Sequence, residues 1–163
     1  MRTKQFDVKA EREIDGNIFY VRPFPAFTAA NISGELAAII TPLLASLAPV
    51  ALSSNANSGE EKNFMDMDAA EAAPMLAKGL ESLSGDKVEA ILRKLLTKHG
   101  NISVEQHGGD MQKLTDDLAN EMFCGNAQDM FILAFEVIKV NFSGFFKKVG
   151  GQFGTALAGM MKA

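Results

Sequence analysis

Residues 131–146 read FILAFEVIKVNFSGFF, and this stretch decides how the chain folds. Its large apolar residues recur at i, i+4, i+7 and i+11, a spacing that aligns them along one ridge of an α-helix. They are Phe131, Phe135, Ile138 and Phe142. Glu136 and Lys139 also fall within the stretch, and both charges would be costly in hydrocarbon. The pattern therefore predicts a core helix over residues 127–143 and not a membrane span.

This helix is apolar over most of its circumference, which leaves a second interpretation open. Met130, Leu133, Ala134, Val137 and Val140 cover much of the surface beside the ridge. A helix of this kind is either buried on all sides or packs on its own domain with one side and on a partner with the other.

The residues after Phe142 follow a different pattern. Ser143-Gly144 interrupts the ridge, two phenylalanines and two lysines then stand side by side, and several glycines follow. Because each glycine disfavours a helix by about 1 kcal/mol, residues 147–163 are predicted to form a flexible tail that becomes ordered on a partner. The predicted partner-binding residues are Phe142, Phe145, Phe146, Lys147, Lys148 and Phe153.

The preceding residues predict a mainly α fold, in which a short N-terminal β-hairpin is followed by a compact bundle of about five helices. Asp15-Gly16, between two short β-rich segments, is a strong signal for a tight turn, so the hairpin is placed at residues 4–23. The bundle is placed at residues 26–146, with a loop at 53–64. Together these elements form a single domain over residues 1–146, followed by the tail over 147–163.

Helices within the bundle are predicted from apolar spacing and capping residues. The first begins near Ala26, with one face formed by Phe27, Ala30, Gly34, Ala37 and Ile40. Others are expected at about 66–82, 86–98, 111–123 and 127–143. Ser84 is the expected N-cap of the helix over 86–98, and Pro74 is a possible break in the helix before it. Residues 101–106, NISVEQ, suggest a short extended segment.

The sequence contains no recognisable catalytic, cofactor-binding or metal-binding motif. His99, His107 and Cys124 are potential ligands or nucleophiles, but their spacing matches no known zinc site and no base is evident beside the cysteine. The chain has a net charge of -4 and no dense basic face, which argues against nucleic acid as a partner. We therefore expect a protein that is not an enzyme and that has no cofactor and no metal.

One further stretch raises the question of a membrane. Residues 36–52 are largely apolar, but they fall short of the roughly 20 residues that a span needs, and Pro42 and Pro49 interrupt them. A buried helix is the preferred interpretation, and no membrane partner is expected. Membrane association through this stretch and the C-terminal Phe/Lys segment remains the alternative.

Two segments carry a resemblance to a known family. These are VRPFPAF at residues 21–27 and AFEVIKVNFSGFF at 134–146. Together with LESLSGDKVEAILRKLL between them, they make the chain resemble the tail assembly chaperones of long-tailed (siphovirus-like) bacteriophages over residues 4–146. The shared features are apolar patterns and not catalytic signatures.

The resemblance implies a role in virion assembly in the host cytoplasm, outside the mature virion. Proteins of this kind hold the long, hydrophobic tape measure protein in solution and help recruit the tail tube protein. Association with further copies of the same chain, as a homo-oligomer, is also considered. The alternatives are a small membrane-associated helical protein and an unrelated protein-interaction adaptor.

Overall fold

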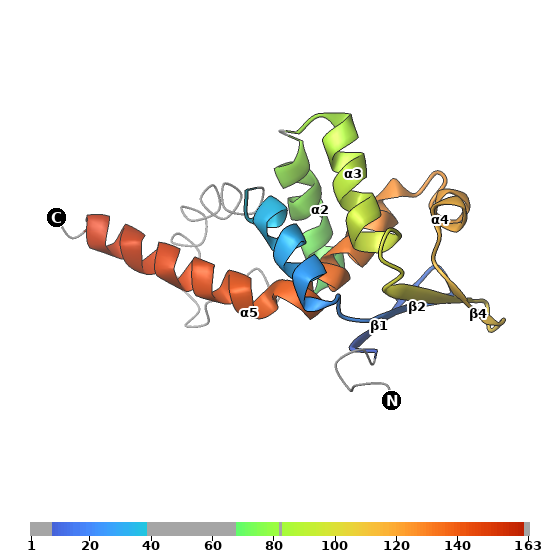
Figure 1. The fold of residues 1–163 in the computed structure, drawn as a ribbon. Coiled ribbons are helices and arrows are strands. Elements are labelled where there is room, and N and C mark those ends of the chain that lie inside the picture. Colours follow the sequence, from blue (N-terminus) through green and yellow to red (C-terminus); the bar gives the residue numbers. More distant parts are fainter. Residues whose placement is uncertain (1–7, 39–67, 82, 162–163) are drawn as a thin grey trace.

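The computed structural model describes residues 8–38, 68–81 and 83–161, with side chains as far as Gly144. Figure 1 shows a small sheet, a group of helices packed beside it, and one long C-terminal helix that continues away from both. The loop predicted at 53–64 and most of the apolar stretch 36–52 lie outside the described residues.

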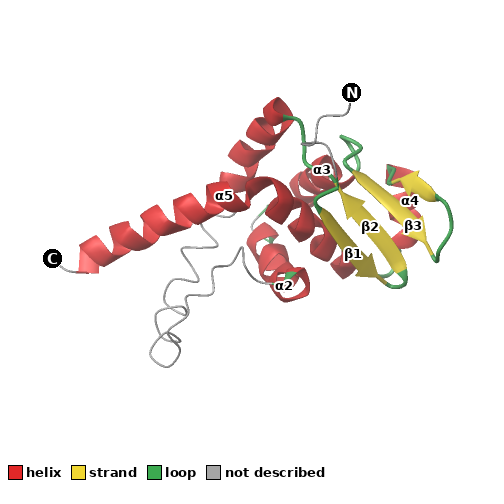
Figure 2. Ribbon diagram, turned by 90° about the horizontal axis from the view of Figure 1, so that it is seen from below, coloured by secondary structure: helices red, strands yellow, loops and turns green. Residues whose placement is uncertain are grey.

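Four antiparallel strands form the sheet in the order β1-β2-β3-β4: β1 (Ala10–Ile14), β2 (Asn17–Val21), β3 (Ile102–Gln106) and β4 (Met111–Lys113). The predicted hairpin is confirmed, since β1 and β2 are joined at Asp15 and Gly16, whose φ angles are 51° and 77°. Positive φ at both central residues is the geometry that matches the twist of paired strands. The sheet appears in Figure 2, where its strands lie side by side.

The predicted hairpin is only part of the sheet. Two further strands, from the second half of the chain, complete it. The extended segment expected at 101–106 is confirmed as β3, which pairs with β2 through Phe19 opposite Val104. The helix expected at 111–123 is wrong in its first part, since Met111–Lys113 is β4. His107 and Gly108, with φ angles of 47° and 76°, turn the chain back beside β3, and this pairing overrides the helical spacing.

The described helices are the one that includes residues 26–38, α2 (Ala69–Leu80), α3 (Gly85–Leu96), α4 (Asp116–Met122) and α5 (Ala127–Met161). Asp68 caps α2, its Oδ1 accepting from the Ala70 backbone N at 2.9 Å. Pro74 lies inside α2 without dividing it. Ser84 occupies the predicted N-cap position of α3, although its side chain makes no capping hydrogen bond. The mainly helical character of the fold is as expected.

The helix over 26–38 buries a different face from the one predicted. Ile32 and Leu36 are 2% and 1% exposed, whereas Phe27 is 94% exposed. Phe24, buried just before the helix, fixes how the chain approaches it. Because the chain enters the helix in this direction, Ile32 and Leu36 point into the core and Phe27 points outward. The predicted face is therefore assigned to the wrong side of the helix.

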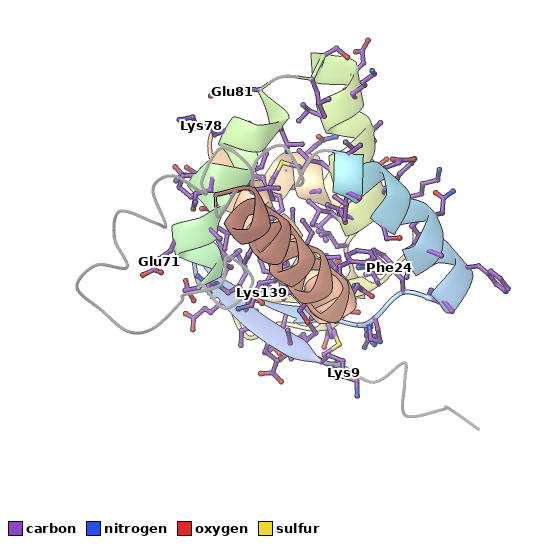
Figure 3. All side chains as sticks on the ribbon, turned by 90° about the vertical axis from the view of Figure 1, so that its left-hand side faces the viewer. Lys9, Phe24, Glu71, Lys78, Glu81 and Lys139 are labelled. Carbon is purple, nitrogen blue, oxygen red and sulfur yellow. The ribbon has the colours of Figure 1, made fainter. Side chains whose placement is uncertain are left out.

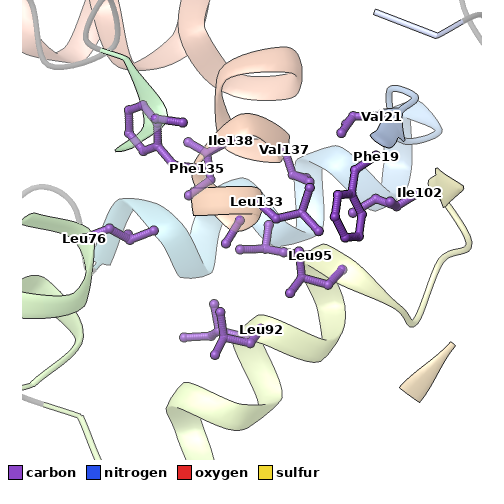
Figure 4. Close-up of a cluster of buried hydrophobic side chains, with 14 of the residues drawn as sticks. Phe19, Val21, Leu76, Leu92, Leu95, Ile102, Leu133, Phe135, Val137 and Ile138 are labelled. Atoms are coloured by element: carbon purple, nitrogen blue, oxygen red, sulfur yellow. The ribbon is translucent and has the colours of Figure 1, made fainter. Parts of the chain in front are cut away.

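The core forms around α5, as the spacing in residues 131–142 predicts. Leu133, Ala134, Phe135, Val137 and Ile138 are each 0% exposed. α5 packs against α2, α3, β1 and β2. Figure 4 shows its side chains between those of the sheet and those of α2 and α3.

Helix α5 continues to Met161, although the sequence predicts that it ends near residue 143. In Figures 1 and 2 its C-terminal part extends away from the sheet and from α2, α3 and α4. A helix already formed in the core needs no new nucleus to grow, so glycine weakens its continuation without forbidding it. We call residues 145–161 of α5 the arm. The division into a domain over 1–146 and a flexible tail over 147–163 stays a prediction.

Candidate functional site

The base of the arm is held by Asn141 and two aromatic rings. Asn141 Oδ1 accepts a hydrogen bond from the Phe24 backbone N at 2.7 Å, and its Nδ2 donates to the Val137 carbonyl at 2.9 Å. The Phe24 ring lies 6.4 Å from the Phe142 ring, centroid to centroid. Figure 3 looks from the free end of the arm, with α2 on one side and the helix over 26–38 on the other. These contacts fix where α5 leaves the core.

A second set of contacts fixes the rotation of α5 about its own axis. Arg12 of β1 reaches Asp68 at 3.0 Å and Glu136 of α5 at 3.5 Å. Glu136 is the acid inside the apolar stretch, and its side chain is only 13% exposed. The hydrogen bond from Arg12 lowers the pKa of Asp68, and that same bond raises the pKa of Arg12. One guanidinium thus ties together β1, the start of α2 and the middle of α5.

Five of the six predicted partner-binding residues lie on the arm, namely Phe145, Phe146, Lys147, Lys148 and Phe153. Phe142 does not, because it is 3% exposed and belongs to the core at the base of the arm. The partner-binding interpretation therefore depends on the five residues beyond it.

The helical backbone places Phe146 and Phe153 on one side and Lys147 and Lys148 on the other, with Phe145 at the edge of the first. Successive residues turn by about 100° around a helix axis, so positions 142, 146, 149, 153 and 160 fall within one narrow sector. They are Phe, Phe, Val, Phe and Met. Lys147, Lys148, Gly151 and Thr155 fall on the other side. The core ridge of α5 thus continues in register along the arm.

This continuity is absent from the sequence-based prediction. There Ser143-Gly144 ends the ridge, and Phe153 is named without Val149 or Met160 among the partner-binding residues. The available signal is the spacing of four, three, four and seven residues from 142 to 160, which passes through Gly144 unchanged. The prediction gives more weight to the glycines after Phe142, which disfavour a helix, than to this spacing.

The three potential ligands or nucleophiles lie in separate segments of the fold. Among the residues that the structure describes, no group of three His, Cys, Asp or Glu side chains is placed to hold a metal ion. His99 follows α3, His107 is in the turn between β3 and β4, and Cys124 is exposed after α4. Desolvation, followed by the charges of Lys98 and Lys94, lowers the pKa of His99.

Comparison with known families gives one result that decides the assignment. The family described as "Phage tail assembly chaperone protein, TAC" matches residues 15–154, which is most of the chain. The chain belongs to this family. The resemblance noted in the sequence is therefore confirmed, and the match includes the first part of the arm. Comparison with curated proteins and with solved structures gives no match.

A role in phage tail assembly with protein partners follows from membership of the chaperone family. Among the described residues, no helix is both long enough and apolar enough to cross a bilayer.

Proposed function

We propose that this tail assembly chaperone holds the tape measure protein in solution and helps recruit the tail tube protein. The observation that supports this most directly is the arm. It is a continuous helix that extends away from the sheet and from α2, α3 and α4 (Figure 1). Its apolar positions continue the ridge of the core, while its lysines fall on the other side.

An arm of this composition suits a long hydrophobic partner. Phenylalanine supplies large apolar contact area, and methionine adapts its shape to different neighbours. An amphipathic helix binds by placing its apolar face against a hydrophobic surface of the partner, with contacts about one turn apart. Lys147 and Lys148 would remain in water on the opposite side and keep the complex soluble.

The proposed setting is the host cytoplasm during assembly, with no place in the mature virion. In this role the protein acts by binding alone, without catalysis, cofactor, nucleic acid or membrane. Self-association is compatible with the role, because several copies would be needed to cover a long partner.

The test is co-expression of the chain with the tape measure protein of the same phage. We expect the wild-type chain to keep the tape measure protein in the soluble fraction and to co-purify with it. Replacing Phe145, Phe146 and Phe153 together by Ser should reduce the soluble fraction several-fold, while the circular dichroism melting curve of the domain changes little. Phe27→Ser is the matched control, because it removes an exposed phenylalanine outside the arm.

Two outcomes would reject the proposal. The first is a wild-type chain that neither binds nor solubilises the tape measure protein. The second is a triple variant that holds the partner as well as the wild type does. If the triple variant unfolds, single substitutions at the three positions identify the ring that belongs to the core, and the remaining rings carry the test.

A further inference from the structure

A second surface of the chaperone, away from the arm, has the form of a small binding site. It is an open pocket of about 720 Å³ between the end of α3 and the segment that joins β4 to α4. Its lining is mainly polar and charged: Arg93, Thr97, Lys98, His99, Gly100, Lys113, Leu114, Thr115, Asp116 and Asp117.

The charges in this pocket differ in how they are neutralised. Arg93 forms ion pairs with Glu89 of its own helix and with Asp116 across the pocket. Asp116 also accepts a hydrogen bond from the Thr97 hydroxyl. Within the described part of the chain, Lys98 and Lys113 have no such partner. The lining of the pocket therefore includes two lysines whose charge no described carboxylate neutralises.

Gly100 explains how Lys113 reaches this position. Its φ is +61°, and a Cβ built on it would fall 2.5 Å from Lys113 Nζ. The lysine thus lies directly over a backbone that has no side chain. A Cβ at position 100 would require the end of the Lys113 side chain to shift.

Stabilising the end of α3 does not account for both lysines. Lys98 follows the last turn of the helix, where a cation offsets the negative end of the dipole. Lys113, however, comes from β4 and reaches the pocket across Gly100. Two separate elements therefore bring positive charge to one opening.

We propose that this pocket binds a single carboxylate group through Lys98 and Lys113. Ammonium groups and a threonine hydroxyl such as that of Thr115 donate hydrogen bonds to carboxylate oxygens. The lining carries three cations, Arg93, Lys98 and Lys113, against the two carboxylates of Asp116 and Asp117, and this small positive excess favours one carboxylate over a polyanion. The carboxylate could belong to a free acid or to a glutamate side chain of a polypeptide. The inference does not depend on the proposed function of the arm.

The two histidines of the chain allow a direct test by proton NMR. His99 lines the pocket, whereas His107 lies in the β3–β4 turn and serves as an internal control. A carboxylate bound beside His99 would favour the imidazolium form, so the His99 titration midpoint should move to higher pH while that of His107 stays in place. The probes are sodium acetate and N-acetylglutamate amide, each compared with sodium chloride at equal ionic strength.

The chloride comparison is essential, because salt alone screens Lys94 and Lys98 and would also raise the His99 midpoint. We expect saturable binding with a dissociation constant on the order of 1 mM. Lys113→Met should weaken it about ten-fold, since it removes a charged hydrogen-bond donor. Lys87→Met, at the opposite end of α3, should leave it unchanged.

Each result has a defined meaning. Acetate and the glutamate derivative binding alike would support a general carboxylate site, and stronger binding of the derivative would support a polypeptide ligand. The proposal is wrong if chloride reproduces the whole effect or if both histidines move together. It is also wrong if Lys113→Met and Lys98→Met both bind as the wild type does.

Discussion

Arg12 shows how much one side chain contributes to this fold. It is the cation for both Asp68 and Glu136, and the carboxylate of Glu136 is mostly buried. A carboxylate buried without a cation is costly, whereas an exposed ion pair is worth little. Most of the stabilisation by Arg12 should therefore come from Glu136, because the Asp68 side chain is 56% exposed and screened by water.

Replacing Arg12 by Met should lower the free energy of unfolding by about 1–2 kcal/mol at pH 7. The Asp68 part of this loss depends on pH. The folded-state pKa of Asp68 is below its ordinary value of 3.8, so its contribution is present above that value and disappears as the pH falls through the folded pKa. Urea unfolding at pH 7 and at pH 3 measures the difference. An R12M penalty that grows as the pH falls would contradict this assignment.

Alanine substitutions at three glycines distinguish the cost of backbone strain from the cost of steric contact. Gly100→Ala meets both a positive φ and the Lys113 side chain, and should cost about 1–3 kcal/mol. Gly125→Ala meets a positive φ of 81° with open space around it, and should cost about 1 kcal/mol. Gly85→Ala meets neither and should stay within about 0.5 kcal/mol of the wild type. Thermal or urea unfolding gives the order, and equal costs at Gly100 and Gly85 would refute it.

At the scale of elements, α5 and the helix over 26–38 each carry a phenylalanine, and the two differ in burial. Phe135 of α5 is 0% exposed, and Phe27 of the other helix is 94% exposed. Both residues lie on ridges that the sequence predicts from spacing. Only the structure shows which ridge faces the core.

Phe135→Ala should therefore lower the free energy of unfolding by about 3–5 kcal/mol, because it leaves a cavity among fully buried neighbours. Phe27→Ala should change it by less than about 0.5 kcal/mol. The pair has identical chemistry and differs only in burial, so urea unfolding of both variants is a matched comparison. A large loss at Phe27 would show that this helix face is covered.

The elements that the sequence predicts correctly are those with local signals. Asp15-Gly16 places the hairpin, Ser84 and the apolar spacing after it place α3, and the ridge through Phe135 places the core. The errors arise where contacts with residues far away in the sequence determine the local structure. Met111–Lys113 becomes a strand because β3 lies beside it, and this neighbour is invisible in the local spacing.

For the whole molecule, the family can be predicted from the sequence, but the helical form of the arm cannot. The apolar segments at 21–27 and 134–146 are enough to indicate the family. The glycines after Phe142 predict a flexible tail, and this stays a prediction. The backbone of α5 is helical to Met161, since the helix already has its nucleus in the core. The carboxylate pocket has no sequence signal, since its residues come from α3, β4, the segments that follow them and the start of α4.

Removing residues 145–163, the arm and the two residues after it, tests whether the rest of the chain folds without the arm. Because the arm extends away from the sheet and from α2, α3 and α4 (Figure 1), the shortened protein should keep a cooperative melting transition within a few degrees of the full chain. It should lose the ability to hold the tape measure protein in solution. Loss of cooperative melting would show that the arm is part of the domain.

Because α5 is one continuous helix, it also fixes how the arm is rotated about the helix axis relative to the core. Arg12 and Phe24 hold the core part of the helix at one rotation, and the backbone transmits that rotation outward. Inserting one residue after Gly144 would turn the outer apolar stripe by about 100° relative to the domain, with its composition unchanged. Inserting seven would restore the direction to within about 20° and only lengthen the arm. The domain therefore sets the direction of the apolar positions along the arm.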